Sequence, residues 1–144
     1  MSTVIRTEIS KRNPYYISKH RYLELKHFCL QYPEWKQEYN RLIEMSNRGV
    51  SVIKLDSANG DRTADIGIRL AELSENLRLV RDTADLIDPC LGHYIFRAVT
   101  EERSYTWLRN VMGIPCSKGV YYGLYRKFWW LLSMCKNYNW YNEE

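Results

Sequence analysis

The sequence predicts an all-α protein, a bundle of about five helices with a long central helix and a C-terminal helix-turn-helix. Three observations support this fold class. Apolar residues recur at steps of three and four along most of the chain, which is the period of an amphipathic helix. Pro33, Pro89 and Pro115 stand where one periodic segment gives way to the next. A Gly-Ile-Pro break that begins at Gly113 separates the last two helical segments.

Length and composition favour one globular domain. The chain has 144 residues, of which 45% are hydrophobic and 26% are charged, as is usual for a folded domain. The formal net charge is +4, and both ends are basic around an acidic middle. Residues 97–144 carry seven Lys or Arg against four acids, whereas residues 46–96 carry six against eight. A charge of +4 permits a nucleic-acid partner but is too small to establish one.

The division that we predict has three parts. Residues 1–46 form an N-terminal helical pair, capped at its start by Ser18 and broken at Pro33, which occupies the first turn of the second helix. Residues 47–61 form a connector, in which "VSVIKL" could make a short extended piece. Residues 62–144 form the long helix and the helix-turn-helix, and they pack with the N-terminal part as a single domain.

The long helix is apolar on two sides. We expect Asp61 to cap its start. Its main seam repeats at heptad spacing and consists of Ile66, Leu70, Leu73, Leu77, Val80, Ala84 and Ile87. A narrower line on the opposite side consists of Ile68, Leu79 and Leu86. Because complementary charges do not flank the seam, we expect it to pack within the chain's own bundle. A helix with two apolar sides is either central in its bundle or shared with a second copy, and we predict a homodimer through residues 62–87.

Two shorter helices follow. Pro89 should open a helix with one apolar face, and residues 100–104 should supply the polar turn after it. That face consists of Leu91, Tyr94, Ile95 and Val99. Tyr105, Leu108, Val111 and Met112 then predict a helix of two to three turns.

Turn signals separate this helix from the last one. Gly113 is a left-handed stop, Ile114 an apolar anchor, and Ser117 a cap for the last helix. We expect one side of the last helix to form core and the other to be cationic and aromatic, able to contact phosphates, stack on bases or fill a partner's pocket. The expected core side is Val120, Leu124, Phe128, Leu131 and Cys135, and the expected outer side is Lys118, Tyr122, Tyr125, Arg126 and Trp129.

Three stretches carry a family resemblance: "NPYYISKHRYLELKHFCLQYPEW", "RTADIGIRLAELSENLRLV" and "AVTEERSYTWLRNVMGIPCSKGVYYGLYRKFWWLL". Together they resemble a family of small phage and prophage proteins of Gram-positive bacteria. That family is similar to late transcriptional regulators of the ArpU/RinA type, whose C-terminal part resembles the helix-turn-helix of sigma-factor region four. The resemblance implies that residues 104–113 form the supporting helix and residues 117–132 the recognition helix.

The resemblance also implies which residues contact DNA. On the recognition helix these are Lys118, Tyr121, Tyr122, Tyr125, Arg126 and Lys127, with Arg103 and Arg109 near the DNA backbone. Gly119 and Gly123 depart from the pattern, since polar or charged residues are expected there. Each glycine removes a side chain that could have contacted a base.

The function that follows is a phage-type DNA-binding transcriptional regulator in the host bacterial cytoplasm. Its expected partners are double-stranded DNA and, in addition, host RNA polymerase. The alternative is a phage inhibitor of a bacterial defence complex, anti-CRISPR-like, which binds a defence nuclease by protein–protein contact. In that case the acidic side chains of the middle segment could occupy a basic groove, although they could equally form a solvated helix face. These acids are Asp61, Asp65, Glu72, Glu75, Asp82, Asp85 and Asp88.

Other chemistry is not indicated. The four cysteines are far apart, and His20 and His27 lie seven positions from each other, so we expect free thiols and no metal or other cofactor. No local motif marks a nucleophile or a phosphate loop, and we expect no enzyme activity. The N-terminus lacks the apolar core of a signal peptide, and the longest apolar run, "FWWLL", is too short to span a membrane.

Overall fold

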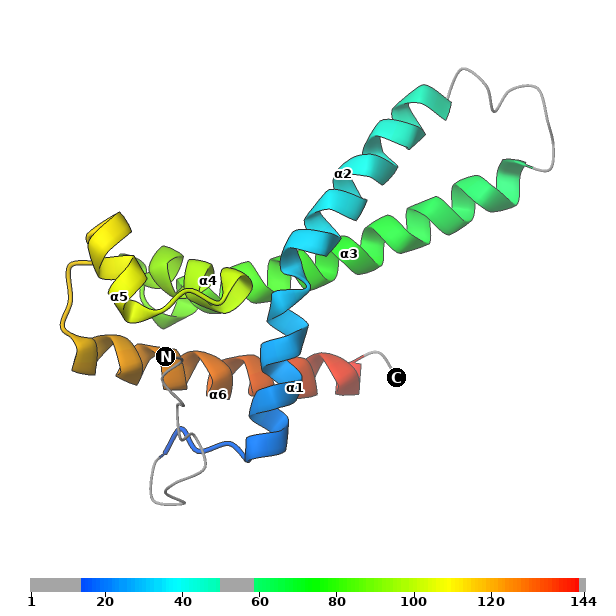
Figure 1. Cartoon of the computed structure of the whole chain (residues 1–144). Coiled ribbons are helices and arrows are strands. Elements are labelled where there is room, and N and C mark those ends of the chain that lie inside the picture. Colours follow the sequence, from blue (N-terminus) through cyan, green and yellow to red (C-terminus); the bar gives the residue numbers. More distant parts are fainter. Residues whose placement is uncertain (1–13, 50–58, 143–144) are drawn as a thin grey trace. The chain divides into compact units, whose positions relative to one another are not determined.

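A computed structural model describes residues 14–49 and 59–142, and all regular structure in these ranges is helical (Figure 1). The all-α fold class is therefore confirmed. The chain divides into two compact units. The central unit is Tyr32–Arg78, and the terminal unit joins the residues up to Gln31 with those from Leu79 onward. The boundaries of these units lie between the first two helices and within the third helix. The three predicted parts, 1–46, 47–61 and 62–144, instead have boundaries at the expected helix ends. Packing of the whole chain as a single domain stays a prediction.

The terminal unit contains most of the helices. They are α1 (Lys19–Leu30), the last part of α3 (Asn59–Ile87), α4 (Gly92–Glu101), α5 (Tyr105–Trp107), a π-helical turn (Leu108–Met112) and α6 (Lys118–Asn142). Helix α1 crosses α6 and also packs on α4, while α4 in turn contacts α6 (Figure 1). Their shared core contains Leu25, Cys29, Val80, Ala84, Ile95, Ala98, Val99, Leu108, Tyr121, Phe128, Trp129 and Leu132.

The start of α1 is fixed as the sequence predicts. The Ser18 hydroxyl accepts a hydrogen bond from the Arg21 backbone N–H at 3.3 Å and so caps the helix. Helix α1 ends at Leu30, and α2 (Tyr32–Gly49) begins two residues later. Pro33 lies in the first turn of α2, where its missing N–H costs no helical hydrogen bond. The predicted break into a helical pair is confirmed.

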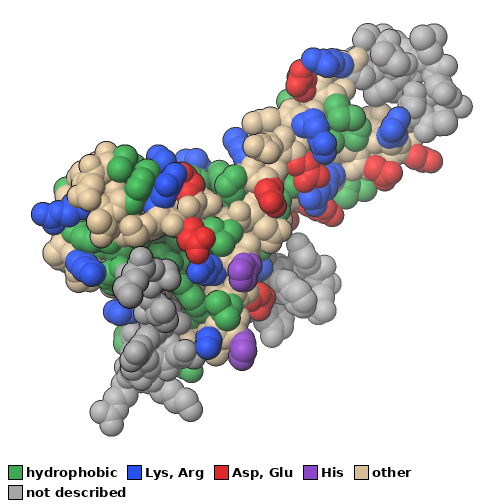
Figure 2. Space-filling view, in the orientation of Figure 1, with side chains coloured by type: hydrophobic (Ala, Val, Ile, Leu, Met, Phe, Trp, Pro, Cys, Tyr) green, Lys and Arg blue, Asp and Glu red, His purple; other side chains and the backbone are tan. Residues whose placement is uncertain are grey.

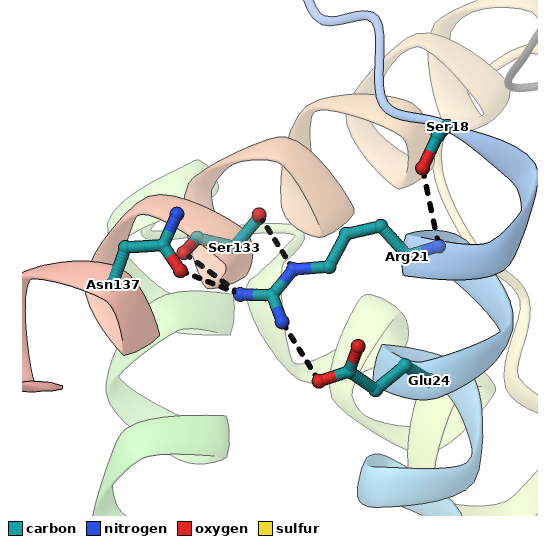
Figure 3. A network of polar contacts seen from close by, with 5 residues as sticks. All are labelled: Ser18, Arg21, Glu24, Ser133 and Asn137. Carbon is teal, nitrogen blue, oxygen red and sulfur yellow. Dashed lines mark hydrogen bonds and ion pairs between the residues drawn. The ribbon is translucent and has the colours of Figure 1, made fainter.

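Arg21 ties α1 to α6 through several hydrogen bonds (Figure 3). Its Nε donates to the Ser133 hydroxyl at 3.0 Å, and its Nη2 donates to the Asn137 side-chain oxygen at 2.9 Å and to the Ser133 carbonyl at 3.3 Å. On its own helix, Nη1 pairs with the Glu24 carboxylate at 2.8 Å. The rigid, planar guanidinium thus satisfies partners on two helices at once, which fixes how far along α6 the crossing occurs.

The central unit contains α2 and the first part of α3. Arg69 of α3 makes a two-pronged contact with Glu38 of α2, with Nε–Oε1 and Nη2–Oε2 distances of 2.9 Å and 2.8 Å. This hydrogen bonding lowers the pKa of the Glu38 carboxyl. Arg69 also contacts Glu72 on its own helix at 3.3 Å. The fork geometry of the guanidinium therefore joins the two helices in a defined register.

The ends of the predicted connector are corrected. Helix α2 continues to Gly49, and α3 begins at Asn59, so Asp61 lies in the first turn of α3 and is not its cap. A carboxylate within the first turn still interacts favourably with the free N–H groups of a helix start. The sequence therefore indicated a helix start near Asp61, but the helix begins three residues earlier than predicted, at Asn59. The possible extended piece "VSVIKL" lies outside the described residues.

The main seam of α3 is confirmed. Leu73, Leu77, Val80, Ala84 and Ile87 are buried, and Ile66 and Leu70 are half-buried. On the opposite line, Ile68 and Leu86 are 60% and 70% exposed among the described residues, whereas Leu79 is half-buried. The homodimer through residues 62–87 stays a prediction.

Helix α4 begins later and ends later than predicted. The Asp88 carboxylate accepts hydrogen bonds from the backbone N–H groups of Cys90 and Leu91, both at 2.7 Å. These bonds hold Pro89 in a turn, and the helix starts at Gly92. Thr100 is not a turn residue: it is buried within α4, and its hydroxyl donates to the Phe96 carbonyl at 2.7 Å.

Gly92 is required by the close approach of α4 to α3. A Cβ atom at this position would lie 2.5 Å from the carbonyl oxygen of Ala84 and 3.2 Å from the Cα of Asp85, and backbone atoms cannot give way as a flexible side chain can. By contrast, a Cβ at Gly67 would meet no atom within 4 Å. The two glycines therefore form a matched pair for a test of packing.

We expect Gly92→Ala to lower the free energy of unfolding by about 1–3 kcal/mol, because the added methyl group forces the backbones of α3 and α4 apart. Gly67→Ala should raise it by up to about 1 kcal/mol, since alanine is the better helix former at an exposed interior position. Urea unfolding followed by circular dichroism measures both values. Equal midpoints for the two variants would contradict the close approach at Gly92.

Candidate nucleic-acid interface

The segment before the Gly-Ile-Pro turn is helical, but it changes type along its length. Ser104 caps α5 by accepting a hydrogen bond from the Trp107 N–H at 3.1 Å. The chain then widens into the π-helical turn Leu108–Met112. Tyr105 and Leu108 are buried as predicted, whereas Val111 is 63% exposed. The wider π turn, with its longer hydrogen-bonded repeat, moves Val111 off the apolar face that α-helical spacing predicts.

The turn itself follows the sequence prediction closely. Gly113 has φ +64°, in the left-handed region, and its N–H donates to the Arg109 carbonyl at 3.1 Å. Ile114 is buried, and the Ser117 hydroxyl caps α6 by accepting from the Val120 N–H at 3.3 Å. The Tyr105 hydroxyl donates to the Cys116 carbonyl at 2.7 Å, which fastens the turn to the segment before it.

The two sides of α6 agree only in part with the prediction: Phe128 is buried and Lys118 exposed as expected, but other positions differ. Trp129, expected on the outer side, is fully buried, and Tyr121 is only 2% exposed. Val120, expected in the core, is 52% exposed, while Leu124, Leu131 and Cys135 are half-buried. The buried side is thus shifted by one position. Large aromatic rings bury more apolar area than Val120 does, and rings of α1 and α5 are available to receive them.

Those aromatic contacts form a continuous cluster. The Trp129 ring meets Tyr22 of α1 edge to face at a centroid distance of 5.4 Å and Tyr125 at 5.6 Å. Tyr121 lies 5.4 Å from Tyr105 and 5.0 Å from Tyr122. Edge-to-face pairs at these distances add to the stabilisation from burial alone. The cluster fixes the rotation of α6 about its own axis.

The eight residues expected to contact DNA therefore divide into two groups. Arg109 and Lys118 are exposed, and Arg126 and Lys127 are half-buried. The other four, with exposures that range from buried to exposed, line one pocket of about 100 Å³. They are Arg103, Tyr121, Tyr122 and Tyr125. The residues are brought to one region of the terminal unit, but the tyrosines face a hollow between helices and do not form an outward row.

Burial keeps the pocket tyrosines neutral. Burial, with a smaller contribution from the neighbouring Tyr122, raises the pKa of Tyr121 well above its usual value. The pKa of Tyr125 is raised in the same way, first by burial and then by Tyr22, and Trp129 opposes that rise. Both hydroxyls remain protonated at neutral pH, so each can donate one hydrogen bond and accept others.

Basic side chains dominate the last part of the terminal unit. Between Arg103 and Asn142 the sequence has no acidic residue. The Lys and Arg residues in this stretch are Arg103, Arg109, Lys118, Arg126, Lys127 and Lys136. Figure 2 shows blue side chains at the end of the terminal unit where α5 and the start of α6 lie. A surface of one sign next to a helix N-terminus favours anionic partners.

Several residues of the pocket were not predicted as site residues. Tyr22 and Lys26 come from α1, Glu102 from the end of α4, and Trp129 was expected on the outer side of α6. The only indication in the sequence was that the segments of α1 and α6 are both rich in aromatic residues. Because nothing local shows that α1 crosses α6, the shared pocket could not be found without the structure.

Comparison with family models, curated proteins and solved structures finds no match to this chain. Within residues 14–49 and 59–142, no three His, Cys, Asp or Glu side chains are grouped so that they could hold a metal ion. None of the helices in the same ranges combines the length and the apolar character needed to cross a membrane.

We expect Tyr105→Phe to lower the free energy of unfolding by about 1 kcal/mol, because the Cys116 carbonyl loses its donor near the Gly-Ile-Pro turn. Hydrogen exchange of the Ile114 amide should also accelerate, since that turn is less firmly held. Tyr94→Phe is the control, because Tyr94 is half-buried and no hydrogen bond of its hydroxyl is found among the described residues. Similar losses of stability in both variants would contradict the role of Tyr105.

Proposed function

We propose that the chain is a phage-type transcriptional regulator that binds double-stranded DNA through the end of the terminal unit formed by α5, the Gly-Ile-Pro turn and α6. One observation supports this proposal: a stretch of 40 residues, 103–142, holds six basic and no acidic residues and includes the turn that joins the π-helical segment to α6. No acidic side chain of residues 103–142 would repel the phosphate backbone of DNA.

Phosphate contacts account for most of the binding in this proposal. Lys118 is the first residue of α6 and exposed, so its ammonium group adds to the positive end of the helix dipole. Arg109 lies in the π-helical turn on the other side of Gly113; it is exposed, and its Nη1 donates to the Tyr105 hydroxyl at 3.3 Å. Arg126 and Lys127 lie about two turns further along α6. In this proposal each of the four cations contacts a DNA phosphate.

Base reading contributes little in this proposal. Gly119 and Gly123 face open space, and the Tyr121 ring is packed against its neighbours. The exposed Val120 between them offers only an apolar contact to a groove. Sequence preference would then come from DNA shape, or from host RNA polymerase bound beside the protein.

The alternative, an inhibitor that presents acids to a defence nuclease, has no comparable support. Its acids on α3 up to Asp85 are exposed, but Arg62, Arg69, Arg78 and Arg81 lie among them on the same helix. Arg69 also pairs with Glu72, one of those acids. A helix with both signs interspersed is typical of a solvated surface.

We expect fluorescence anisotropy to detect duplex DNA binding at low salt, with an affinity that falls steeply as salt is added. The double variant Arg109→Gln, Lys118→Gln should bind more weakly and should lower the slope of log affinity against log salt by about 2, one for each lost phosphate contact. Lys36→Gln, Arg62→Gln removes two exposed charges from the central unit and should leave the slope unchanged. Absence of binding by the unaltered chain at low salt would rule out the proposal.

A further inference from the structure

Val120 is an exposed apolar side chain at the start of α6, between two glycines and close to several cations. We propose that Val120 contacts the 5-methyl group of thymine in the major groove and so gives the protein a preference for thymine at one position of its DNA site. The inference rests on the proposed function for its partner, duplex DNA. It adds one base contact to a mode of binding in which phosphates supply most of the affinity.

The position of Val120 is fixed by its neighbours. Its backbone N–H donates to the Ser117 hydroxyl at 3.3 Å, and the Tyr121 N–H donates to the Ser117 carbonyl at 3.0 Å. Tyr121 is only 2% exposed, so its burial holds the rotation of α6 about its axis. A β-branched side chain in a helix has one strongly preferred rotamer. The methyl groups of Val120 are therefore held in place at the start of α6 before any partner binds.

The helix backbone beside Val120 is bare. A Cβ atom at Gly119 or at Gly123 would meet no atom within 4 Å, so packing requires neither glycine. Backbone conformation does not require them either, because Gly113 is the only glycine with positive φ within the described ranges. Gly123 lies one turn after Val120 on the same side of α6. What the two glycines do allow is a closer approach of another molecule than a residue with a Cβ atom would permit.

Charge decides between a second copy of the chain and DNA as the molecule that approaches. Lys127 lies two turns after Val120 on the same side of α6, and Arg126 precedes it. Two copies that met through this side would bring their cations together, which is unfavourable. Duplex DNA instead provides phosphates along the edges of its grooves. The same surface is therefore complementary to DNA and not to itself.

The chemistry of valine selects the group that it contacts. Valine has neither a donor nor an acceptor in its side chain, so it gains nothing from a phosphate or from the polar edge of a base. The thymine 5-methyl is the methyl group that unmodified bases present in the major groove. In a helix-turn-helix, residues at the start of the second helix are those that reach the base edges. Val120, as the third residue of α6, has this position.

The test compares two duplexes of alternating sequence that differ only in the 5-methyl group, one with thymidine and the other with deoxyuridine. We expect fluorescence anisotropy at low salt to show about fourfold tighter binding of the full chain to the thymidine duplex, as burial of one methyl group provides. Val120→Ala should abolish this ratio and leave the affinity for the deoxyuridine duplex unchanged. Ile68→Ala, which truncates an exposed apolar side chain of the central unit, should keep the ratio.

Gly123→Ala separates a role in binding from a role in folding. Alanine is the better helix former, so this variant should unfold at a higher urea concentration than the unaltered chain. Its added methyl group should nevertheless hold DNA away from α6, weaken binding to the thymidine duplex and bring the ratio of the two affinities towards one. A loss of stability that matches the loss of affinity, or no loss of affinity, would count against the close approach and overturn the assignment.

The remaining outcomes separate this inference from the proposed function. Salt-dependent binding of the unaltered chain to both duplexes with equal affinity would overturn the thymine contact and leave the proposed function intact. A ratio that persists in Val120→Ala would likewise overturn the assignment to Val120. Absence of binding to either duplex at low salt would instead overturn the proposed function, and with it the inference.

Discussion

The burial of one aromatic side of α6 against α1 is the constraint on which the terminal unit depends. Trp129 and Phe128 are fully enclosed, and Tyr22 reaches across from α1 to meet the indole ring edge to face. Arg21 adds directional hydrogen bonds to Ser133 and Asn137, about one and two turns after Trp129 along α6. Apolar burial supplies most of the stabilisation, while the guanidinium defines the register, because hydrogen bonds are directional and the hydrophobic effect is not.

This constraint also decides what α6 presents to solvent. Once Tyr121 and Trp129 point inward, helical geometry turns Gly119, Val120 and Gly123 outward. The outward side of α6 therefore has few side chains with which to read a base. The aromatic rings of Tyr121 and Trp129 are gathered at the pocket, which Lys26 and Arg103 also line.

The parts of the fold that the sequence predicts are those governed by local chemistry. Ser18 and Ser117 cap helices, Pro33 divides a helical pair, and Gly113 adopts the left-handed conformation, since each effect involves atoms only a few residues apart. The start of α4 could not be predicted from Pro89 alone. The Asp88 carboxylate accepts hydrogen bonds from the two N–H groups that follow the proline, which delays the helix start. This effect is also local, but the sequence analysis did not include it.

The phase of α6 could not be predicted, because its apolar residues are nearly continuous from Phe128 to Leu132. In such a run, periodicity does not distinguish one side of the helix from another, and tertiary contacts decide. The candidate site could be predicted only in part, because its pocket also depends on tertiary contacts. Its basic residues are visible in the sequence, but the pocket depends on α1, about 100 positions before α6, and on the rotation of α6 about its axis.

Glu102 ends α4 in a left-handed conformation. It has φ +57°, the only positive φ of a residue other than glycine within the described ranges. Glycine would adopt this conformation without the steric cost that a Cβ atom imposes. The carboxylate offsets part of that cost through its ion pair with Lys26, but both side chains are partly exposed, so the pair adds little stability. A left-handed glutamate therefore contributes less to folding than a glycine would. The conformation nevertheless has a structural role: Glu102 is the C-cap of α4, and the Arg103 N–H that follows it donates to the Ala98 carbonyl at 3.2 Å, so the left-handed residue ends the helix and turns the chain toward α5.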